Sequence, residues 1–221
     1  MKTKTLILTV ALVAGTMSTA AQTANNDAAT VTWAMTSGTT TEQPVFAPES
    51  AAQFIQKAEI TKGSGIGTPI AQTSTVDGIT QTMFPVTSKS SAASDANAVN
   101  FLITLKDGIA FTPTKVSLKT FRWKTDKGNI DISWICDDRP NRGAGTGTGN
   151  ASELSYDISG SAASEQQFGI SVNIYNFDVA ADKGASVGDI VIEGTLYGTV
   201  GQPLTYSLTV STSPEGAGTV Q

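Results

Sequence analysis

The stretch Gln167–Phe177, QFGISVNIYNF, carries the pattern that decides the fold. Its even positions from 168 to 174 are apolar, whereas its odd positions carry Ser171, Asn173 and Tyr175. Successive side chains of a β-strand point to opposite faces of a sheet. The alternation therefore predicts a strand with one core-facing and one solvent-facing side.

The same two-residue period recurs on both sides of this stretch. Further predicted strands are 29–35, 78–86, 98–106, 111–124, 129–136, 153–159 and 187–198. Pro85 places 78–86 toward a sheet edge, and the Gly-rich run 139–150 predicts a hairpin loop. The segment 48–61 could begin as a helix or could equally be a strand. About eight to ten strands at this spacing predict one all-β domain, an antiparallel β-sandwich or jelly roll.

The N-terminus has the layout of a secretory signal peptide. Two lysines precede an apolar run over 6–17, and small residues follow. A membrane-spanning helix needs about 20 apolar residues, and this run is shorter. We predict a signal peptide over 1–21, a β-sandwich domain over 22–198, and no transmembrane segment. The mature chain is then secreted, to the extracellular space, the cell surface or the periplasm.

The charge balance argues against nucleic acid as a partner. The chain has 14 basic and 19 acidic residues. Removal of the signal peptide takes away Lys2 and Lys4, which leaves 12 basic against 19 acidic residues and a net charge of −7. Phosphate backbones are bound by basic surfaces, and the sequence shows no basic stripe.

The residues that most hydrolases need are missing from the sequence. There is no histidine, so imidazole-dependent mechanisms and the usual zinc sites are excluded. The single cysteine, Cys136, shares strand parity with Ile132 and Trp134, which predicts a small core residue. The adjacent Asp137 and Asp138 would point to opposite faces of a strand, unlike the paired acids of a glycosidase. We predict no catalytic residue in this chain.

Two groups of oxygen-bearing side chains are candidate calcium sites. One consists of Asp126, Asn129 and Asp131, and the other of Asp178 and Asp182. Carboxylate and amide oxygens are the ligands that Ca²⁺ prefers. Neither group matches a specific calcium-loop pattern, so ordinary surface acids remain the alternative.

Aromatic side chains are candidate sugar contacts wherever they face solvent. Trp33 and Trp134 share strand parity with apolar neighbours, which predicts core positions. Tyr175 and Asn173 lie together on the polar side of their strand and are candidate glycan-binding residues. An ordinary solvent-facing sheet surface is the alternative for this pair.

Trp123 is ambiguous, because the apolar face of its strand changes parity between Leu118 and Phe121. In one interpretation a β-bulge brings both sets into the core. In the other, Trp123 is exposed with Arg122 and Lys124 beside it, and these three residues form a glycan-binding site.

The end of the chain predicts a new structural unit. The segment 199–205 contains Gly and Pro and predicts a linker. The following stretch 206–221, YSLTVSTSPEGAGTVQ, alternates like a strand and turns at SPEGAG. A lone hairpin is marginally stable in water. We therefore expect the polypeptide to continue into a repeat module and further domains.

Three motifs carry a resemblance to a known family: FTPTKVS (111–117), IDISW (130–134) and IVIEGT (190–195). With the final hairpin pattern, they resemble the N-terminal β-sandwich region of secreted bacterial pectate-lyase-like proteins. The resemblance implies a sandwich that precedes repeat modules and a right-handed β-helix lyase domain. The lyase residues of that family lie on β-helix coils, and this chain has no coil-length repeat, so none of them is carried over.

These observations predict a secreted, non-catalytic accessory module of a pectin-type polysaccharide-degrading protein, with a plant polysaccharide as its partner. One alternative is a structural or adhesive surface domain without a ligand. Another is a pectate lyase whose catalytic β-helix lies beyond this chain. An exposed Trp123 would favour glycan binding, and a buried Trp123 would favour the scaffold.

Overall fold

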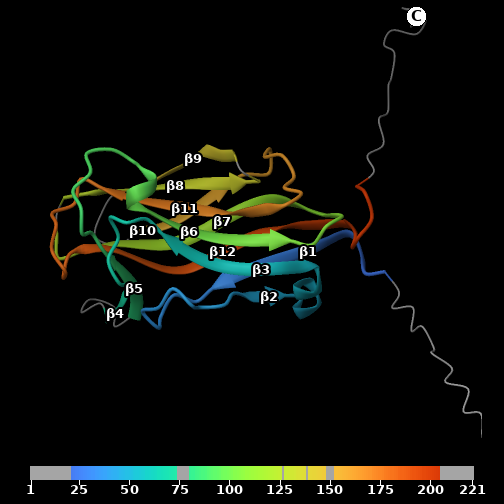
Figure 1. The fold of residues 1–221 in the computed structure, drawn as a ribbon, viewed down its shortest axis with the longest axis horizontal. Helices are drawn as coiled ribbons and strands as arrows, with labels where there is room; N and C mark the ends of the chain where they lie inside the picture. Colours follow the sequence, from blue (N-terminus) through green and yellow to red (C-terminus); the bar gives the residue numbers. More distant parts are fainter. Residues whose placement is uncertain (1–20, 74–79, 126, 138, 148–151, 205–221) are drawn as a thin grey trace, which may run out of the picture.

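A computed structural model describes residues 21–73, 80–125, 127–137, 139–147 and 152–204. In these residues the chain forms two antiparallel β-sheets packed face to face around one hydrophobic core (Figure 1). This confirms the predicted all-β sandwich. Nearly all of the predicted signal peptide and the predicted repeat module, 206–221, lie outside the described residues.

The larger sheet, here called sheet A, has seven strands among the described residues. These strands are β1 (Thr23–Trp33), β2 (Val45–Ala47), β4 (Ile70–Thr73), β5 (Thr80–Pro85), β7 (Ile109–Trp123), β10 (Ser152–Asp157) and β12 (Gly184–Thr199). The main order is β10-β7-β12-β1-β2, and β5 joins β12 and β4 at one end. The long strand β12 is therefore the centre of this layer.

The second sheet, sheet B, has five strands in the order β3-β6-β11-β8-β9. Its strands are β3 (Ile55–Lys62), β6 (Ala98–Leu105), β8 (Asn129–Cys136), β9 (Arg139–Gly147) and β11 (Gln167–Tyr175). Two short 3-10 helices, η1 (Glu49–Phe54) and η2 (Asp95–Asn97), precede β3 and β6. Figure 1 shows the strands of sheet B following one another from β9 at the top to β3 below.

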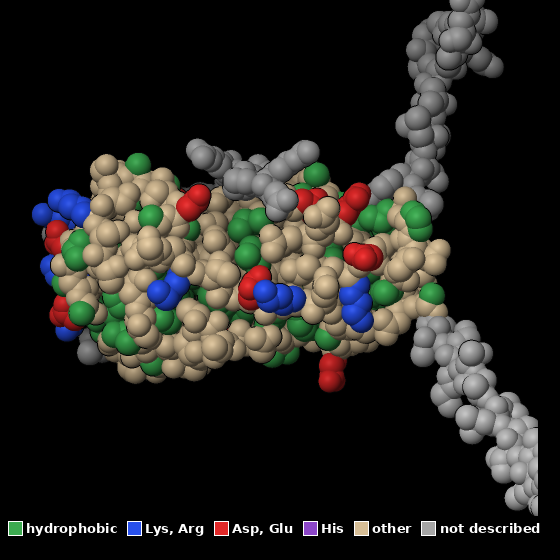
Figure 2. All heavy atoms as spheres, in the orientation of Figure 1, with side chains coloured by type: hydrophobic (Ala, Val, Ile, Leu, Met, Phe, Trp, Pro, Cys, Tyr) green, Lys and Arg blue, Asp and Glu red, His purple; other side chains and the backbone are tan. Residues whose placement is uncertain are grey.

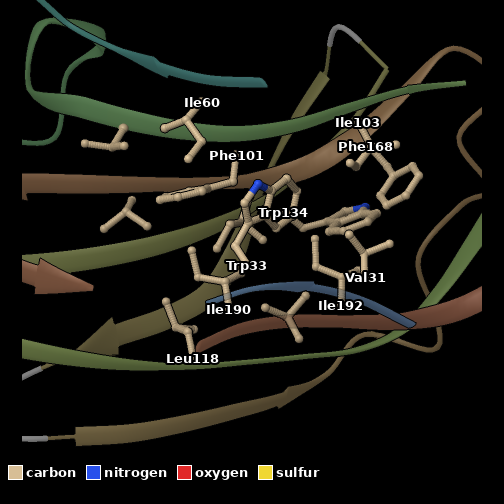
Figure 3. Packing of buried hydrophobic residues seen from close by; sticks show 14 of the residues in the cluster. Val31, Trp33, Ile60, Phe101, Ile103, Leu118, Trp134, Phe168, Ile190 and Ile192 are labelled. Atoms are coloured by element: carbon tan, nitrogen blue, oxygen red, sulfur yellow. The ribbon is translucent and has the colours of Figure 1, made fainter. Parts of the chain in front are cut away.

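The core lies between the two sheets and is rich in aromatic side chains. Trp33 is 0% exposed and Trp134 is 1% exposed, which confirms both as core residues. Trp33 meets Phe101 edge-on with ring centroids 5.8 Å apart, and Phe111 stacks on Phe168 at 4.0 Å. Figure 3 shows Trp33 of sheet A beside Phe101 and Trp134 of sheet B. Alternation on both sheets thus converges on one apolar layer.

Two predictions about individual strands were wrong. The Gly-rich run does not form a loop over its first nine residues, because Arg139–Gly147 pairs with β8 as strand β9. Ladder hydrogen bonds use the backbone, so a run of glycines can form an outer strand at the sheet edge, where Pro140 is also tolerated. Strand β5 is not an edge strand either, since it pairs with both β12 and β4. Pro85 is compatible with this position because it is the last residue of β5.

The turn after β8 is organised by a carboxylate. Asp137 Oδ1 accepts hydrogen bonds from the backbone N–H groups of Glu165, Gln166 and Gln167, at 3.0, 2.8 and 3.1 Å. Half-buried Cys136 packs beside it against the core. Asp137 therefore joins the end of β8 to the start of β11, and this role is structural.

Both ends of the domain lie at the same end of the sandwich. Strand β1 begins opposite the last residue of β12, with Thr23 paired to Thr199. The Val200 N–H donates to Gln22 O at 2.9 Å, and the Gly201 N–H donates to Asp107 O at 2.8 Å. The first residues of the segment predicted as a linker are therefore bound to the domain. Figure 1 shows the described chain entering and leaving at this end.

The surface of the domain is polar but sparsely charged. Figure 2 shows a broad face on which backbone and uncharged polar side chains predominate and charged side chains are scattered. Among the described residues, large apolar side chains that are strongly exposed are limited to Val45 and Val179. The same residues contain no helix with the length and apolar character needed to cross a membrane.

Candidate functional site

The outer surface of sheet B brings polar residues of three adjacent strands together. On β11 and β8, Asn173 stands opposite Asp131, and Tyr175 stands opposite Asn129. On the other side of β11, the register places Ser171 opposite Asn100 of β6. We call this surface the polar face and define it by these residues: Asn100, Asn129, Asp131, Ser171, Asn173 and Tyr175. The strand neighbours of Asn100, Asp131, Ser171 and Asn173 on both sides are buried in the core, so these four side chains lie on the outer surface of sheet B. Ser171 is itself 8% exposed and lies at the base of this surface.

Hydrogen bonds hold the side chains of the polar face in place. Tyr175 donates its hydroxyl to Asp131 Oδ2 at 2.8 Å, and the Asn173 amide donates to Ser171 Oγ at 3.3 Å. Asn129 Oδ1 accepts a hydrogen bond from the Asn176 amide at 2.9 Å. The carboxylate, the amides and the phenol ring are therefore oriented before any ligand arrives.

An apolar strip borders the polar face along the same strands. In the register, Gly169 of β11 lies between Leu102 of β6 and Ile135 of β8. Both flanking side chains are half-buried, and the glycine places no side chain between them. A ligand on this surface would thus meet planar hydrogen-bonding groups beside a patch of apolar carbon.

The environment of Tyr175 changes its acidity. The hydrogen bond to Asp131 raises the pKa of the Tyr175 hydroxyl above its ordinary value, and burial and the negative charge of Asp131 act in the same direction. At neutral pH the phenol is therefore protonated and donates to the carboxylate.

We predict that Tyr175 ionises above the ordinary tyrosine pKa of about 10. The folded state holds this proton more tightly than the unfolded chain. The resulting contribution of Tyr175 to the free energy of unfolding is fully present below a pH of about 10. It is lost as the pH rises through the folded-state pKa of Tyr175. Tyrosinate absorbance, recorded for the native protein and for Tyr175→Phe, isolates this titration. Asp131→Asn should move it back toward 10, and a Tyr175 pKa at or below 10 in the native protein would contradict the assignment.

The structure places Trp123 on the other layer of the sandwich. Strand β7 pairs without a shift with β10 over Lys115–Thr120 and with β12 over Lys119–Trp123. The interpretation with a bulge between Leu118 and Phe121 was therefore wrong, because near this stretch the extra residue lies in β12, between Gly188 and Val191. Trp123 consequently faces outward from sheet A.

Trp123 is half-buried on this outer surface. Its ring lies 5.5 Å from that of Phe121, centroid to centroid. Its indole Nε1 is buried and has no hydrogen-bond partner among the described residues. It is therefore neither a core residue nor a fully exposed sugar platform.

The basic neighbours of Trp123 have structural contacts. Arg122 alternates to the opposite side of β7 from Trp123 and donates from Nη1 to Gly128 O at 3.3 Å. Lys124 directly follows the strand and forms an ion pair with Asp182 at 3.2 Å. The predicted glycan-binding residues are thus divided, with Asn173 and Tyr175 on sheet B and the other three at the end of β7.

The two predicted calcium groups differ in the structure. Asp178 and Asp182 each form an ion pair with a lysine, at 3.3 and 3.2 Å. Asn129 and Asp131 are both in the polar face, and Asp126 lies outside the described residues. The described part of the chain holds no cluster of three His, Cys, Asp or Glu side chains that could share a metal ion. Calcium binding by Asp126, Asn129 and Asp131 stays a prediction.

Sequence reasoning missed that Asn100 and Asp131 belong to the same surface as Asn173. The local sequence does indicate that Asn100 and Asp131 each face outward, because both alternate with apolar residues of their own strands. The order of the strands was not visible, because β6, β8 and β11 are far apart in the chain. Pairing of β11 with both partners brings the three together.

Comparison with known proteins gives a distant structural similarity and no family. No family model matches the sequence, and no curated protein matches it. One similar structure contains the CBM22-1–GH10 modules of endo-1,4-β-D-xylanase 10B from Clostridium thermocellum, complexed with xylohexaose. The TM-score is 0.31 and the sequence identity is 15%. The match covers 67% of this chain and 28% of that chain. Another is the enzymatically active domain of tailspike protein 4 of bacteriophage CBA120, with a TM-score of 0.26 and 16% identity over 65% of this chain and 19% of that one. The chain thus spans less than a third of either structure, and its structural similarity to both is distant.

Proposed function

We propose that this protein is a secreted, non-catalytic β-sandwich module that binds polysaccharide through the polar face. The observation that carries the proposal is the preorganised set of Tyr175, Asp131 and Asn173 on one solvent-facing surface. Sugar hydroxyls both donate and accept hydrogen bonds, and carboxylate, amide and phenol groups match them in both roles. Leu102 and Ile135 offer apolar carbon for the C–H surface of a sugar ring.

The dimensions of the polar face suit an oligosaccharide segment rather than one sugar. From Gly169 to Tyr175, β11 advances six residues, or about 20 Å at 3.3 Å per residue. Three adjacent strands about 4.8 Å apart give the face its width. A chain of several sugar units can therefore lie along β11 and contact all of the residues that define the face.

Charge favours a neutral stretch of a pectin-type polysaccharide. Asp131 is the one carboxylate among the six residues of the polar face. An acidic glycan would meet this carboxylate and a net-negative chain, which costs affinity unless calcium bridges the two. The resemblance to pectate-lyase-like proteins supports a pectic context, in which this module holds substrate near an enzyme. The absence of histidine supports a non-catalytic role.

The test is calorimetric titration of residues 22–221 with neutral pectic galactan, xylan and polygalacturonate, the last with and without calcium. We expect saturable binding of at least one neutral glycan, and weaker binding of polygalacturonate when calcium is absent. Asp131→Ala and Asn173→Ala should each raise Kd about tenfold, as expected for loss of about 1.4 kcal/mol of hydrogen bonding.

The matched control is Asp189→Asn on sheet A, where Asp189 pairs with Lys119 at 3.7 Å. This variant should bind like the native protein, because it removes a surface carboxylate away from the polar face. Equal loss of affinity in Asp189→Asn and Asp131→Ala would point to net charge instead of a site. Absence of binding to every glycan would overturn the proposal.

A scaffold or adhesive domain without a ligand is the second candidate. It is favoured by the tryptophans, since Trp33 and Trp134 are buried and Trp123 is half-buried. None of these three rings offers a fully exposed stacking surface. The titrations above separate the two candidates, because a scaffold binds none of the glycans.

A further inference from the structure

A pocket of about 380 Å³ lies beside η1, away from the polar face. Its lining residues are Asp27, Ala28, Pro48, Ser50, Ala51, Gln53, Phe54 and Leu196. The volume falls in the range of about 300–1,000 Å³ that is usual for small-molecule sites. The pocket joins the first part of β1 in sheet A to the helix that leads directly into β3 of sheet B.

The pocket has an apolar floor and a polar rim. Ala51, Phe54 and Leu196 are 4, 3 and 2% exposed, so they form the buried floor. The rim residues Asp27 and Gln53 are exposed and carry a carboxylate and an amide. This combination of an apolar body and a few convergent polar groups is the usual composition of a ligand pocket.

Strand alternation places Asp27 on the same side of β1 as Ala29, Val31 and Trp33. The pairing of β1 with β12 shifts between Asn25 and Asp27, and Asn26 has φ 58°. After the shift Asp27 stands opposite Leu196, whose side chain belongs to the core. Asp27 thus lies on the core-facing side of sheet A, where its strand otherwise carries apolar residues. The bulge interrupts the ladder just before Asp27, and β-bulges are over-represented next to functional sites.

The backbone of β1 contributes a further polar wall. Strand β2 pairs with β1 over Thr30–Thr32. Among the described residues, no strand pairs with that edge of β1 over 25–29, next to the pocket. Backbone N–H and C=O groups on this edge are available to a ligand. The bulge interrupts regular spacing there, so an added peptide strand would fit poorly.

We propose that this pocket binds one or two residues of a neutral sugar, as a site separate from the polar face. The carboxylate of Asp27 accepts hydrogen bonds from neighbouring hydroxyls of the sugar. Gln53 and Ser50 donate and accept at the rim, and Pro48 with the apolar floor contacts the C–H surface of the ring. Asp27 is the one ionisable side chain in the lining, so it disfavours an anionic sugar.

The test uses amide chemical shifts of residues 22–221 during titration with methyl β-D-galactopyranoside, methyl β-D-xylopyranoside, xylobiose and D-galacturonate. We expect a saturable response to a neutral probe in the amides of 27–28 and 50–54, and no such response to galacturonate. Asp27→Ala should weaken the binding at least fivefold and Gln53→Ala about threefold. The control Asp189→Asn, an exposed acid of sheet A paired with Lys119, should leave it unchanged.

Three results would overturn this inference. They are the absence of saturable shifts in these amides with every neutral probe, equal binding by Asp27→Ala, and equal binding of galacturonate. The inference and the proposed function fail separately, because Asn173→Ala should spare the pocket and Asp27→Ala should spare glycan binding on the polar face. Circular dichroism of each variant confirms that the fold is retained.

Discussion

Replacement of Phe168 by alanine should lower the free energy of unfolding by about 4 kcal/mol, within the range found for buried Phe→Ala changes. Phe168 is 0% exposed and lies between the two sheets. Its ring stacks on Phe111 of sheet A at 4.0 Å and on Trp134 of sheet B at 6.0 Å, centroid to centroid. The truncation leaves a cavity where the layers meet, and urea denaturation followed by tryptophan fluorescence measures its cost.

Two further variants define the expected scale. Phe168→Leu keeps most of the apolar volume and should cost less than half as much as Phe168→Ala. Val179→Ala changes a side chain that is 51% exposed and should alter stability by less than about 0.5 kcal/mol. A cost below about 1 kcal/mol for Phe168→Ala would contradict the packing described for this residue.

Gly169→Ala should destabilise the domain by about 3 kcal/mol or more, since overpacking against rigid backbone is costly. A Cβ atom at this position would lie 1.9 Å from the carbonyl oxygen of Phe101 and 3.1 Å from Cα of Leu102. Both atoms belong to the backbone of β6, which pairs with β11. The clash can be relieved only if the two central strands of sheet B separate. Chemical denaturation together with soluble yield measures the effect.

The matched control is Gly160→Ala, because a Cβ at that position has no neighbour within 4 Å. It should change stability by no more than about 0.5 kcal/mol. If Gly169→Ala behaved like Gly160→Ala, β11 and β6 could not be as close as described. The register that aligns the polar face would then need revision.

These two sites connect the core to the proposed function. Phe168 points inward, and Gly169 belongs to the outer row of β11 together with Ser171 and Asn173. A strand held by its inward side chains cannot slip by one residue without moving its outer row into the core. Core packing is thus what keeps Asn173 opposite Asp131.

The two proposed sites occupy different parts of the sandwich. The polar face is the outer surface of sheet B, whereas the Asp27 pocket is a concave site beside η1. The polar face would bind several consecutive sugar units of a glycan, whereas the pocket would bind one or two sugar residues. Their joint presence on one domain would raise affinity for chains that engage both.

Part of this architecture was predictable from local sequence. Alternation with a period of two assigned Trp33 and Trp134 to the core and placed Asn173 and Tyr175 on one solvent-facing side, and the structure agrees. It also indicated an all-β sandwich. These features depend on a strand's own geometry, in which side-chain direction follows position along the chain.

Other features depended on partners that local sequence does not reveal. The Gly-rich run Arg139–Gly147 is a strand because β8 supplies a ladder, and Trp123 faces outward because the extra residue lies in β12. The extra residue of β1 just before Asp27 is likewise defined only by the pairing of β1 with β12.

The sequence by itself therefore determined the class of fold and which residues of each strand share a side. Only the tertiary structure decided which strands are neighbours, and so which polar residues form one surface. Tyr175 and Asp131 illustrate this, since they are 44 positions apart and meet at 2.8 Å. The physical reason is that alternation is a property of a single strand, whereas strand order and register arise from burying both sheets against one core.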